Sequence, residues 1–220
     1  MTTRARIAAA AAATVLLLTA AAPAHAQDPV RVQQPARAQE PIRTRENFHA
    51  SLVDAAMERL AHRETYDGSY RRIGYPMGDV PDSIGVCTDL VVRAYRGVGL
   101  DLQQLVHEDM RDYFDEYPTI WGLRAPDTNI DHRRVPNLQT FFSRHGTVLP
   151  ITENAADYRP GDIVTWMLPG NLPHIGIVAE QHSSDGLRHL IVHNIGAGPA
   201  LDDILFRYEI TGHYSYPGPR

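Results

Sequence analysis

The segment HIGIVAEQHSSDGLRHLIVHNIG, residues 174–196, determines the fold class that this sequence predicts. Two runs rich in β-branched residues lie on either side of SSDG (183–186), a group of residues typical of a tight turn. The segment therefore predicts a β-hairpin. Because residues that face each other across an antiparallel pair lie close together, we expect His174 and His193 to be nearly opposite on it.

The segments on both sides of this hairpin predict an α+β fold. DIVTW (162–166) and RYEITGHYSY (207–216) have the short, β-branched and aromatic character of further strands. Upstream, apolar residues recur at three- and four-residue steps, which is typical of amphipathic helices. Helices first and strands after predict N-terminal helices packed on a C-terminal antiparallel sheet. The expected helices cover residues 47–62, 88–98, a segment capped by Asp101, and 136–146, where Gly146 is expected in the left-handed position after the last turn.

The N-terminus predicts an exported protein. Residues 1–26 combine arginines, the apolar run 7–22 and an Ala-His-Ala site, and together these features indicate a cleaved signal peptide. The apolar run is too short for a membrane-spanning helix, so we expect no stable membrane insertion after cleavage. Residues 27–45 are polar and proline-bearing and predict a flexible leader, and residues 46–217 predict one domain. We expect a periplasmic or secreted monomer.

The charge balance argues against nucleic acid as a partner. The chain has 21 Lys and Arg residues, all of them arginine, against 26 Asp and Glu residues, for a formal net charge of −5. A net acidic chain is repelled by polyanions, and no basic patch interleaved with aromatic residues is present in the sequence.

Cys87, the single cysteine, is the candidate nucleophile. It lies where the helix expected at 88–98 begins, beside unsatisfied backbone N–H groups and the positive end of the helix dipole. Both effects stabilise a thiolate, so a lowered cysteine pKa is expected. The alternative is that Cys87 is a small buried hydrophobe.

A nucleophilic cysteine needs a base, usually a histidine that is oriented by a third group. Of the 11 histidines, His174 and His193 are the two that the hairpin brings together. Near-opposite pairing lets one imidazole fix the tautomer of the other. Cys87, His174 and His193 therefore form a candidate nucleophile, base and orienting group.

Several motifs resemble the NlpC-type cell-wall cysteine peptidases, which have a papain-like fold. The matching segments are RPGDIVTW (159–166), HIGIVAEQ (174–181) and IVHN (191–194), downstream of a cysteine that opens a helix. The resemblance implies hydrolysis of an amide bond in peptidoglycan stem peptides, with no metal or organic cofactor. Residues 70–216 also resemble, nearly throughout, an exported bacterial family of unknown function. One departure from the peptidase pattern is that the acid, Asp89, follows the cysteine rather than preceding it.

Five further residues are weaker candidates for substrate binding. Tyr75 is the tyrosine that we align with the one that often precedes the nucleophile in NlpC-type enzymes. Asp89 is four residues before Arg93, a spacing that favours an ordinary surface ion pair, with a substrate clamp as the alternative. The other three are His132 and Arg133, which either line a substrate groove or belong to a charged surface stretch, and Asn194, an alternative to His193.

Other functions stay open at this point. The histidines at 174, 182, 189 and 193 are close in sequence, and three of them with a water would suit a zinc-dependent hydrolase. Strand alternation counts against that arrangement, because His182 is expected beyond the end of its strand and His189 at the far side of the hairpin. A redox thiol would need a second protein, because no second cysteine is present. A non-catalytic module that binds peptidoglycan and keeps a papain-like shell is the remaining alternative.

Overall fold

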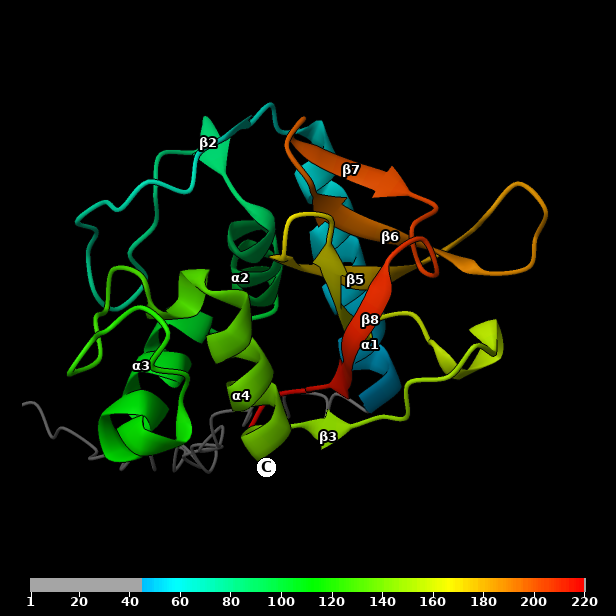
Figure 1. Ribbon diagram of the computed structural model, residues 1–220. Coiled ribbons are helices and arrows are strands. Elements are labelled where there is room, and N and C mark those ends of the chain that lie inside the picture. The colour runs from blue at the N-terminus through cyan, green and yellow to red at the C-terminus, as the bar shows by residue number, and fades with distance from the viewer. Residues whose placement is uncertain (1–44, 220) are drawn as a thin grey trace, which may run out of the picture. The chain divides into compact units, whose positions relative to one another are not determined.

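A six-stranded antiparallel sheet is the centre of the computed structural model, which describes residues 45–219 (Figure 1). The spatial order of its strands is β3-β8-β4-β5-β6-β7. The signal peptide and nearly all of the leader expected from the sequence lie outside the described residues. The strands are β3 (Thr147–Val148), β4 (Ile163–Leu168), β5 (Leu172–His182), β6 (His189–Asn194), β7 (Pro199–Asp202) and β8 (Glu209–Ser215).

Four α-helices precede all six strands of this sheet in the described part of the chain, so the expected mixture of N-terminal helices and an antiparallel sheet is confirmed. They are α1 (Arg45–Glu58), α2 (Cys87–Gly97), α3 (Leu102–Asp112) and α4 (Val135–His145). Short 3-10 helices lie at η1 (Arg59–Ala61), η2 (Phe114–Glu116), η3 (Asp131–Arg133) and η4 (Ala155–Asp157). A separate parallel pair joins β1 (Thr65–Tyr66) to β2 (Ile84–Gly85), directly before α2.

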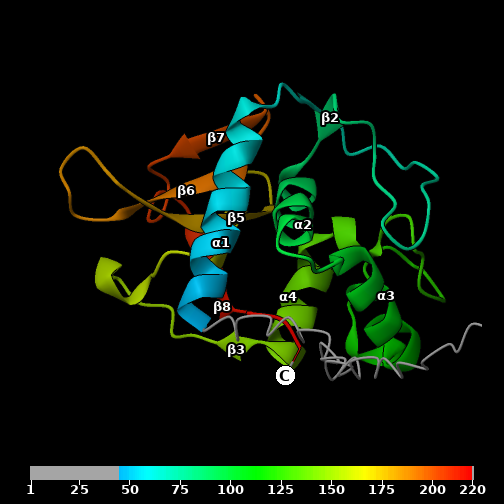
Figure 2. The same ribbon diagram turned by 180° about the vertical axis from the view of Figure 1, so that it is seen from behind.

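The main hydrophobic core lies between the helices and one face of the sheet. Helices α1 and α2 pack against β5, and Figure 2 shows α1 in front of the sheet with α2 beside it. Ile175 and Ile177 of β5 face this core with Leu90 and Val91 of α2. A smaller core around Trp166 covers the other face. Because both faces of β4 and β5 are buried, these strands read as nearly continuous apolar runs in the sequence.

The hairpin expected from residues 174–196 is confirmed as β5–β6. Its register pairs Gly176 with His193, and a bulge near the turn pairs His182 with His189. His182 is the last residue of β5, so the expectation that it falls beyond the strand is wrong. The bulge adds residues to β5 without breaking the pairing.

The helix boundaries follow the sequence closely, with one local correction. Asp101 caps α3 as expected, because its carboxylate accepts a hydrogen bond from the N–H of Gln103 at 3.2 Å. Gly146, however, has φ −97° rather than a left-handed conformation. A glycine is needed there for space, since a Cβ would lie 2.7 Å from the carbonyl oxygen of Phe142 and 2.9 Å from that of Ser215.

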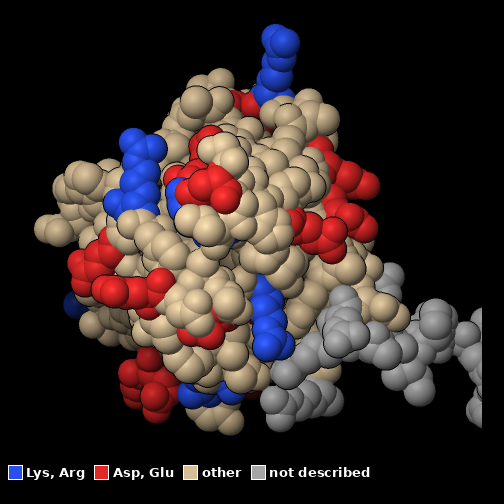
Figure 3. All heavy atoms as spheres, turned by 90° about the vertical axis from the view of Figure 1, so that its right-hand side faces the viewer, with Lys and Arg blue, Asp and Glu red and all other residues tan. Residues whose placement is uncertain are grey.

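Within residues 45–219, every helix is too short or too polar to cross a membrane. On the side of the molecule shown in Figure 3, acidic side chains are spread over the view and basic side chains are interspersed among them.

Candidate functional site

Cys87 is the first residue of α2, where the sequence places it. The carboxylate of Asp89 accepts a hydrogen bond from the N–H of Val86 at 2.8 Å and so holds the first turn. The Cys87 side chain is buried, with 4% of the residue exposed. Its sulfur accepts hydrogen bonds from the N–H groups of Ile175 and Thr88 and from the hydroxyl of Tyr66. The donor Ile175 follows His174 directly, so the sulfur lies against the part of β5 that carries this histidine.

The expectation of a lowered cysteine pKa is wrong for this conformation. Burial raises the pKa of Cys87 to about 11, and the hydrogen bonds from Ile175 and Thr88 offset only part of that effect. Desolvation penalises the thiolate more strongly than one helix end stabilises it. At neutral pH the resting site therefore holds a neutral thiol.

His174 and His193 are in contact, although they are not opposite each other in the register. The first residue of β5 that pairs with β6 is Gly176, opposite His193. His174 lies two residues beyond that end of the ladder, and its Nε2 reaches Nδ1 of His193 diagonally at 3.0 Å. Gly176 leaves the necessary room, because a Cβ there would lie 3.2 Å from Cβ of His193 and 2.6 Å from Cγ2 of Ile191.

Asp202 continues this contact onto a third strand, and sequence reasoning missed it. Its Oδ2 lies 3.1 Å from Nε2 of His193. The strand that carries it, β7, is four residues long and begins with proline, so its sequence reads as a loop. A period-2 pattern over four residues is too short to detect, and no other signal marks Asp202. His174, His193 and Asp202 thus come from the adjacent strands β5, β6 and β7.

Burial controls the charge of both histidines. His174 is 1% exposed, and desolvation followed by the proximity of His193 lowers its pKa to about 3. Desolvation also lowers the pKa of His193, while the carboxylate of Asp202 opposes that shift. At neutral pH both imidazoles are therefore neutral, and His174 has a proton-accepting nitrogen available.

Tyr66, rather than Tyr75, is the tyrosine at the sulfur. Tyr66 ends β1, and its hydroxyl donates to the sulfur of Cys87. The residue is 44% exposed, so it contacts both the buried thiol and solvent. Tyr75 instead packs edge-on against His107 of α3, with 5.1 Å between ring centroids. The alignment of Tyr75 with the tyrosine of NlpC-type enzymes is therefore wrong in position.

Asp89 and Arg93 do not form the surface pair that their spacing favours. Both are buried, and they bind different partners. Asp89 is held by Arg133 through two hydrogen bonds of 2.8 and 2.9 Å. Arg93 binds the carboxylates of Asp79 and Glu64, each at 2.9 Å. The long-range partners are fixed by tertiary packing, which an i, i+4 rule does not describe.

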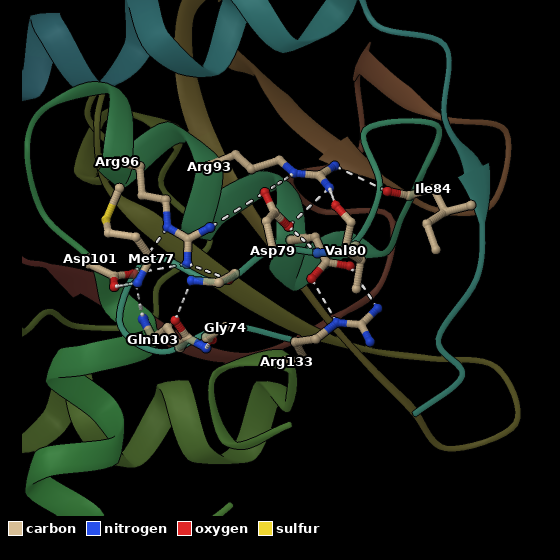
Figure 4. Close-up of polar contacts among 12 residues, drawn as sticks. Gly74, Met77, Asp79, Val80, Ile84, Arg93, Arg96, Asp101, Gln103 and Arg133 are labelled. Carbon is tan, nitrogen blue, oxygen red and sulfur yellow. Dashed lines mark hydrogen bonds and ion pairs between the residues drawn. The ribbon is translucent and has the colours of Figure 1, made fainter. Parts of the chain in front are cut away.

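Three arginines, Arg93, Arg96 and Arg133, bind the segment between β1 and β2 and hold it near the start of α2 (Figure 4). Arg93 also donates to the carbonyl oxygens of Val80 and Ile84, each at 3.2 Å. Arg96 donates to the carbonyl oxygen of Gly78 at 2.8 Å. Arg133 extends the same support, because it donates to the carbonyl oxygens of Asp67 and Ser69 at 3.1 Å. The strand that carries Tyr66 is therefore anchored through this segment.

Two other weak candidates are structural in this conformation. His132 is 2% exposed, so it neither lines an open groove nor belongs to the surface. Burial lowers its pKa to about 3, and its Nδ1 has no hydrogen-bond partner among the described residues. Asn194 donates to the carbonyl oxygen of Gly85 at 3.4 Å and accepts from the N–H of Gly196 at 3.2 Å. The ring of His174 bonds to His193 and not to Asn194.

The histidines proposed as zinc ligands divide into two pairs. His182 and His189 face each other near the hairpin turn, with ring centroids 4.1 Å apart. His174 and His193 lie at the opposite end of the same two strands. Within residues 45–219, no group of three or more His, Cys, Asp or Glu side chains is arranged to hold a metal ion.

Two open pockets of the described region lie away from the sulfur. One of about 720 Å³ is lined by residues that include His49, Asp162 and Ser215. Another of about 650 Å³ lies between the C-terminal ends of α3 and α4. Neither is lined by Cys87, His174 or His193. Cys87, His174 and His193 are themselves at most 4% exposed, so the candidate site is closed in this conformation.

The comparisons with known proteins define the class of this chain. It belongs to the family described as "Domain of unknown function (DUF1287)", whose model matches residues 53–216. It is also similar to "Uncharacterized protein YijF" of Escherichia coli (strain K12), with 49% identity over 170 residues, 77% of this chain and 82% of that protein. The expected membership of a family of unknown function is thereby confirmed. The cysteine, the histidine pair and the carboxylate all lie within the matched residues.

Proposed function

We propose that this chain is a thiol hydrolase with a papain-like fold, which cleaves an amide bond with Cys87 as nucleophile, His174 as general base and His193 as orienting group. One observation carries the proposal. The sulfur at the N-terminus of α2 is hydrogen-bonded to the residue next to His174, whose ring is bonded to His193. The helical half packed on an antiparallel sheet, with the cysteine opening a helix and the histidines on neighbouring strands, supports the fold assignment.

Acylation begins with proton transfer from the thiol of Cys87 to Nδ1 of His174, the ring nitrogen that is not bonded to His193. The sulfur attacks the carbonyl carbon and forms the C–S bond, while the carbonyl π electrons move to oxygen. The N–H of Cys87, at the positive end of α2, stabilises this oxyanion. The C–N bond then breaks, and the amine leaves with the proton that His174 returns.

In deacylation, water replaces the thiol as the group that His174 deprotonates. His174 takes a proton from water, whose oxygen attacks the thioester carbon, and the C–S bond breaks. The acid product leaves, and the sulfur recovers a proton from His174. The cycle needs no oxidant or reductant, because the thiol proton that leaves with the amine is replaced by a proton from water.

In the closed conformation the thiol of Cys87 and the ring of His174 are both neutral. Proton transfer between them therefore requires a substrate-bound geometry that differs from the closed one. The hydrogen bonds of the sulfur are with Ile175, Thr88 and Tyr66 rather than with the His174 ring. Substrate entry would move Tyr66 aside and bring a polar carbonyl to the thiol, which reduces the penalty on charge separation. Contacts between catalytic groups are often longer before substrate binds.

Peptidoglycan stem peptides are the proposed substrate, on the strength of the motif resemblance and of the signal peptide expected at the N-terminus. The test is digestion of purified muropeptides, with products identified by mass. We expect cleavage by the wild-type protein and none by Cys87→Ala or His174→Ala. Tyr75→Phe is a matched control that leaves the sulfur and both imidazoles untouched, so it should cleave at the wild-type rate.

The same experiment separates the alternative functions. Cleavage that is abolished by a chelator and survives in Cys87→Ala would replace the thiol mechanism with a metal-dependent one. Tight binding of sacculi by both proteins, without cleavage by either, would establish a non-catalytic binding module.

A further inference from the structure

We propose that Asp202 is a positioning residue that sets the tautomers of both imidazoles, so that Nδ1 of His174, the ring nitrogen that is not bonded to His193, is the one that lacks a proton. This inference rests on the proposed function, because it assigns which ring nitrogens of that same site carry protons. It adds to the cysteine and two histidines a fourth side chain, from a strand that the sequence does not reveal.

The hydrogen bonds can be assigned a direction from the carboxylate inward. A carboxylate only accepts hydrogen bonds, so Nε2 of His193 must carry the proton that bridges the 3.1 Å distance to Asp202. A neutral imidazole has one N–H, so Nδ1 of His193 is an acceptor. Nε2 of His174, 3.0 Å away, must then be the donor. Nδ1 of His174 is consequently unprotonated, as a general base requires.

The strand register explains how one carboxylate can fix the tautomers of both imidazoles. Asp202 pairs with Ile191, two residues from His193 on the same strand, so the carboxylate and the imidazole lie on the same face of the sheet. His174 approaches from the other neighbour of β6 in the same diagonal manner. His193 therefore lies between a carboxylate and an imidazole, with a partner at each ring nitrogen.

Exposure adds a second role for the same carboxylate. The side chain of His193 is fully buried, whereas that of Asp202 is 51% exposed. When His174 takes the thiol proton, a positive charge appears in a buried pair of imidazoles, and the carboxylate of Asp202 contacts that pair through Nε2 of His193. The carboxylate stabilises that charge through His193 and keeps its own hydration, so no anion has to be buried to do so.

The first test measures tautomers directly and needs no substrate. Long-range proton–nitrogen NMR spectra of the ¹⁵N-histidine-labelled protein distinguish Nδ1–H from Nε2–H rings, and His174→Gln and His193→Gln variants assign the signals. We expect both rings to be Nε2–H in the wild type. In Asp202→Ala, we expect His193 to become a mixture of tautomers. An Nδ1–H ring at His174 in the wild type, or unchanged tautomers in Asp202→Ala, would overturn the proposal.

The second test uses muropeptide cleavage. Asp202→Ala should lower kcat about tenfold or more with KM nearly unchanged, the kind of loss that follows removal of a group that orients a histidine. Asp202→Glu, which keeps the carboxylate, should restore part of it. Asp203→Ala is the matched control, because the adjacent Asp203 binds Arg188 and not His193. An equal loss of kcat in Asp203→Ala and Asp202→Ala would count against a specific role for Asp202.

The two tests fail in different ways. The expected tautomers in a protein that cleaves no muropeptide would retain the positioning role of Asp202 and remove the hydrolase. Cleavage that needs Cys87 and His174, combined with unchanged tautomers and kcat in Asp202→Ala, would retain the hydrolase and remove the positioning role.

Discussion

Nε2 of His174 lies 3.0 Å from Nδ1 of His193, and the two rings are nearly perpendicular, at 85°. The contact is diagonal across β5 and β6, and it exists because Gly176 leaves the space opposite His193 empty. The HIG sequence at residues 174–176 therefore supplies both the imidazole and the gap that orients it. This relationship underlies the predictions that follow.

Replacement of Gly176 by alanine should displace His193. The added Cβ would lie 2.6 Å from Cγ2 of Ile191 and 3.0 Å from the carbonyl oxygen of Val192, so β6 has to shift. We expect the free energy of unfolding to fall by about 1–3 kcal/mol, as is typical of overpacking. Urea unfolding followed by circular dichroism measures this loss. Gly74→Ala is the control, because the nearest atom to its Cβ is 3.7 Å away; equal losses in both variants would contradict the steric argument.

Alkylation of Cys87 should be slow at neutral pH and rise steeply in alkali. The thiolate is the reactive form, and burial raises the pKa of Cys87 to about 11. The rate with iodoacetamide should therefore increase up to about pH 11. In urea-unfolded protein the same thiol should titrate near 8.5, the value of free cysteine. Fast alkylation of the folded protein at pH 7, with an apparent pKa below 8, would show that the resting thiol is charged.

The buried ion pair between Asp89 and Arg133 should be essential for stability. Both side chains are at most 3% exposed, so Arg133→Met leaves an uncompensated buried carboxylate. We expect a loss of about 3–5 kcal/mol in the free energy of unfolding. The exposed pair between Arg71 and Asp67 offers a control, because Arg71→Met should cost less than about 1 kcal/mol. A double variant, Asp89→Asn with Arg133→Met, should recover part of the loss, and its failure to do so would mean that the charge is not the cause.

Acid should destabilise the protein through its buried histidines. Burial lowers the pKa of both His132 and His174 to about 3, against about 6.5 in the unfolded chain. The unfolded state therefore binds more protons below pH 6.5, and stability is lost as pH falls from there toward 3. Each histidine contributes about 2 kcal/mol of loss between pH 7 and pH 5. Urea titrations at both pH values measure it, and His132→Gln should reduce the drop; an unchanged drop would contradict the assignment for His132.

The sequence predicted those parts of the fold that have a strong local signal. The hairpin at 174–196 and the helix that Cys87 opens follow from periodicity and turn chemistry. The long apolar strands also have a clear pattern in the sequence. Strand β7 was missed because a proline and three further residues carry no period, and Asp202 was missed with it. The contact between His174 and His193 was predicted. Its diagonal geometry depends on Gly176, whose steric role is visible only in the folded structure.

The electrostatic expectations failed where burial outweighed local rules. Helix-end geometry alone favours a thiolate at Cys87, whereas the folded site excludes water and favours the thiol. The spacing of Asp89 and Arg93 suggests a surface pair, yet each side chain meets a distant partner in the interior. Long-range partners and desolvation arise only when the chain is packed, so one sequence does not reveal them. Tyr66 was missed for the same reason, since its contact with Cys87 spans 21 positions of chain.

The most direct test of the account is a search for the covalent intermediate on Cys87. Protein mixed with muropeptide and quenched in acid within the first turnovers should carry an added mass equal to the acyl half of the cleaved substrate. Peptide mapping should place that mass on the fragment that contains Cys87, and His174→Ala should show none. Cleavage of muropeptides with no acyl mass on Cys87 at any quench time, at an activity unchanged in Cys87→Ala, would contradict the account.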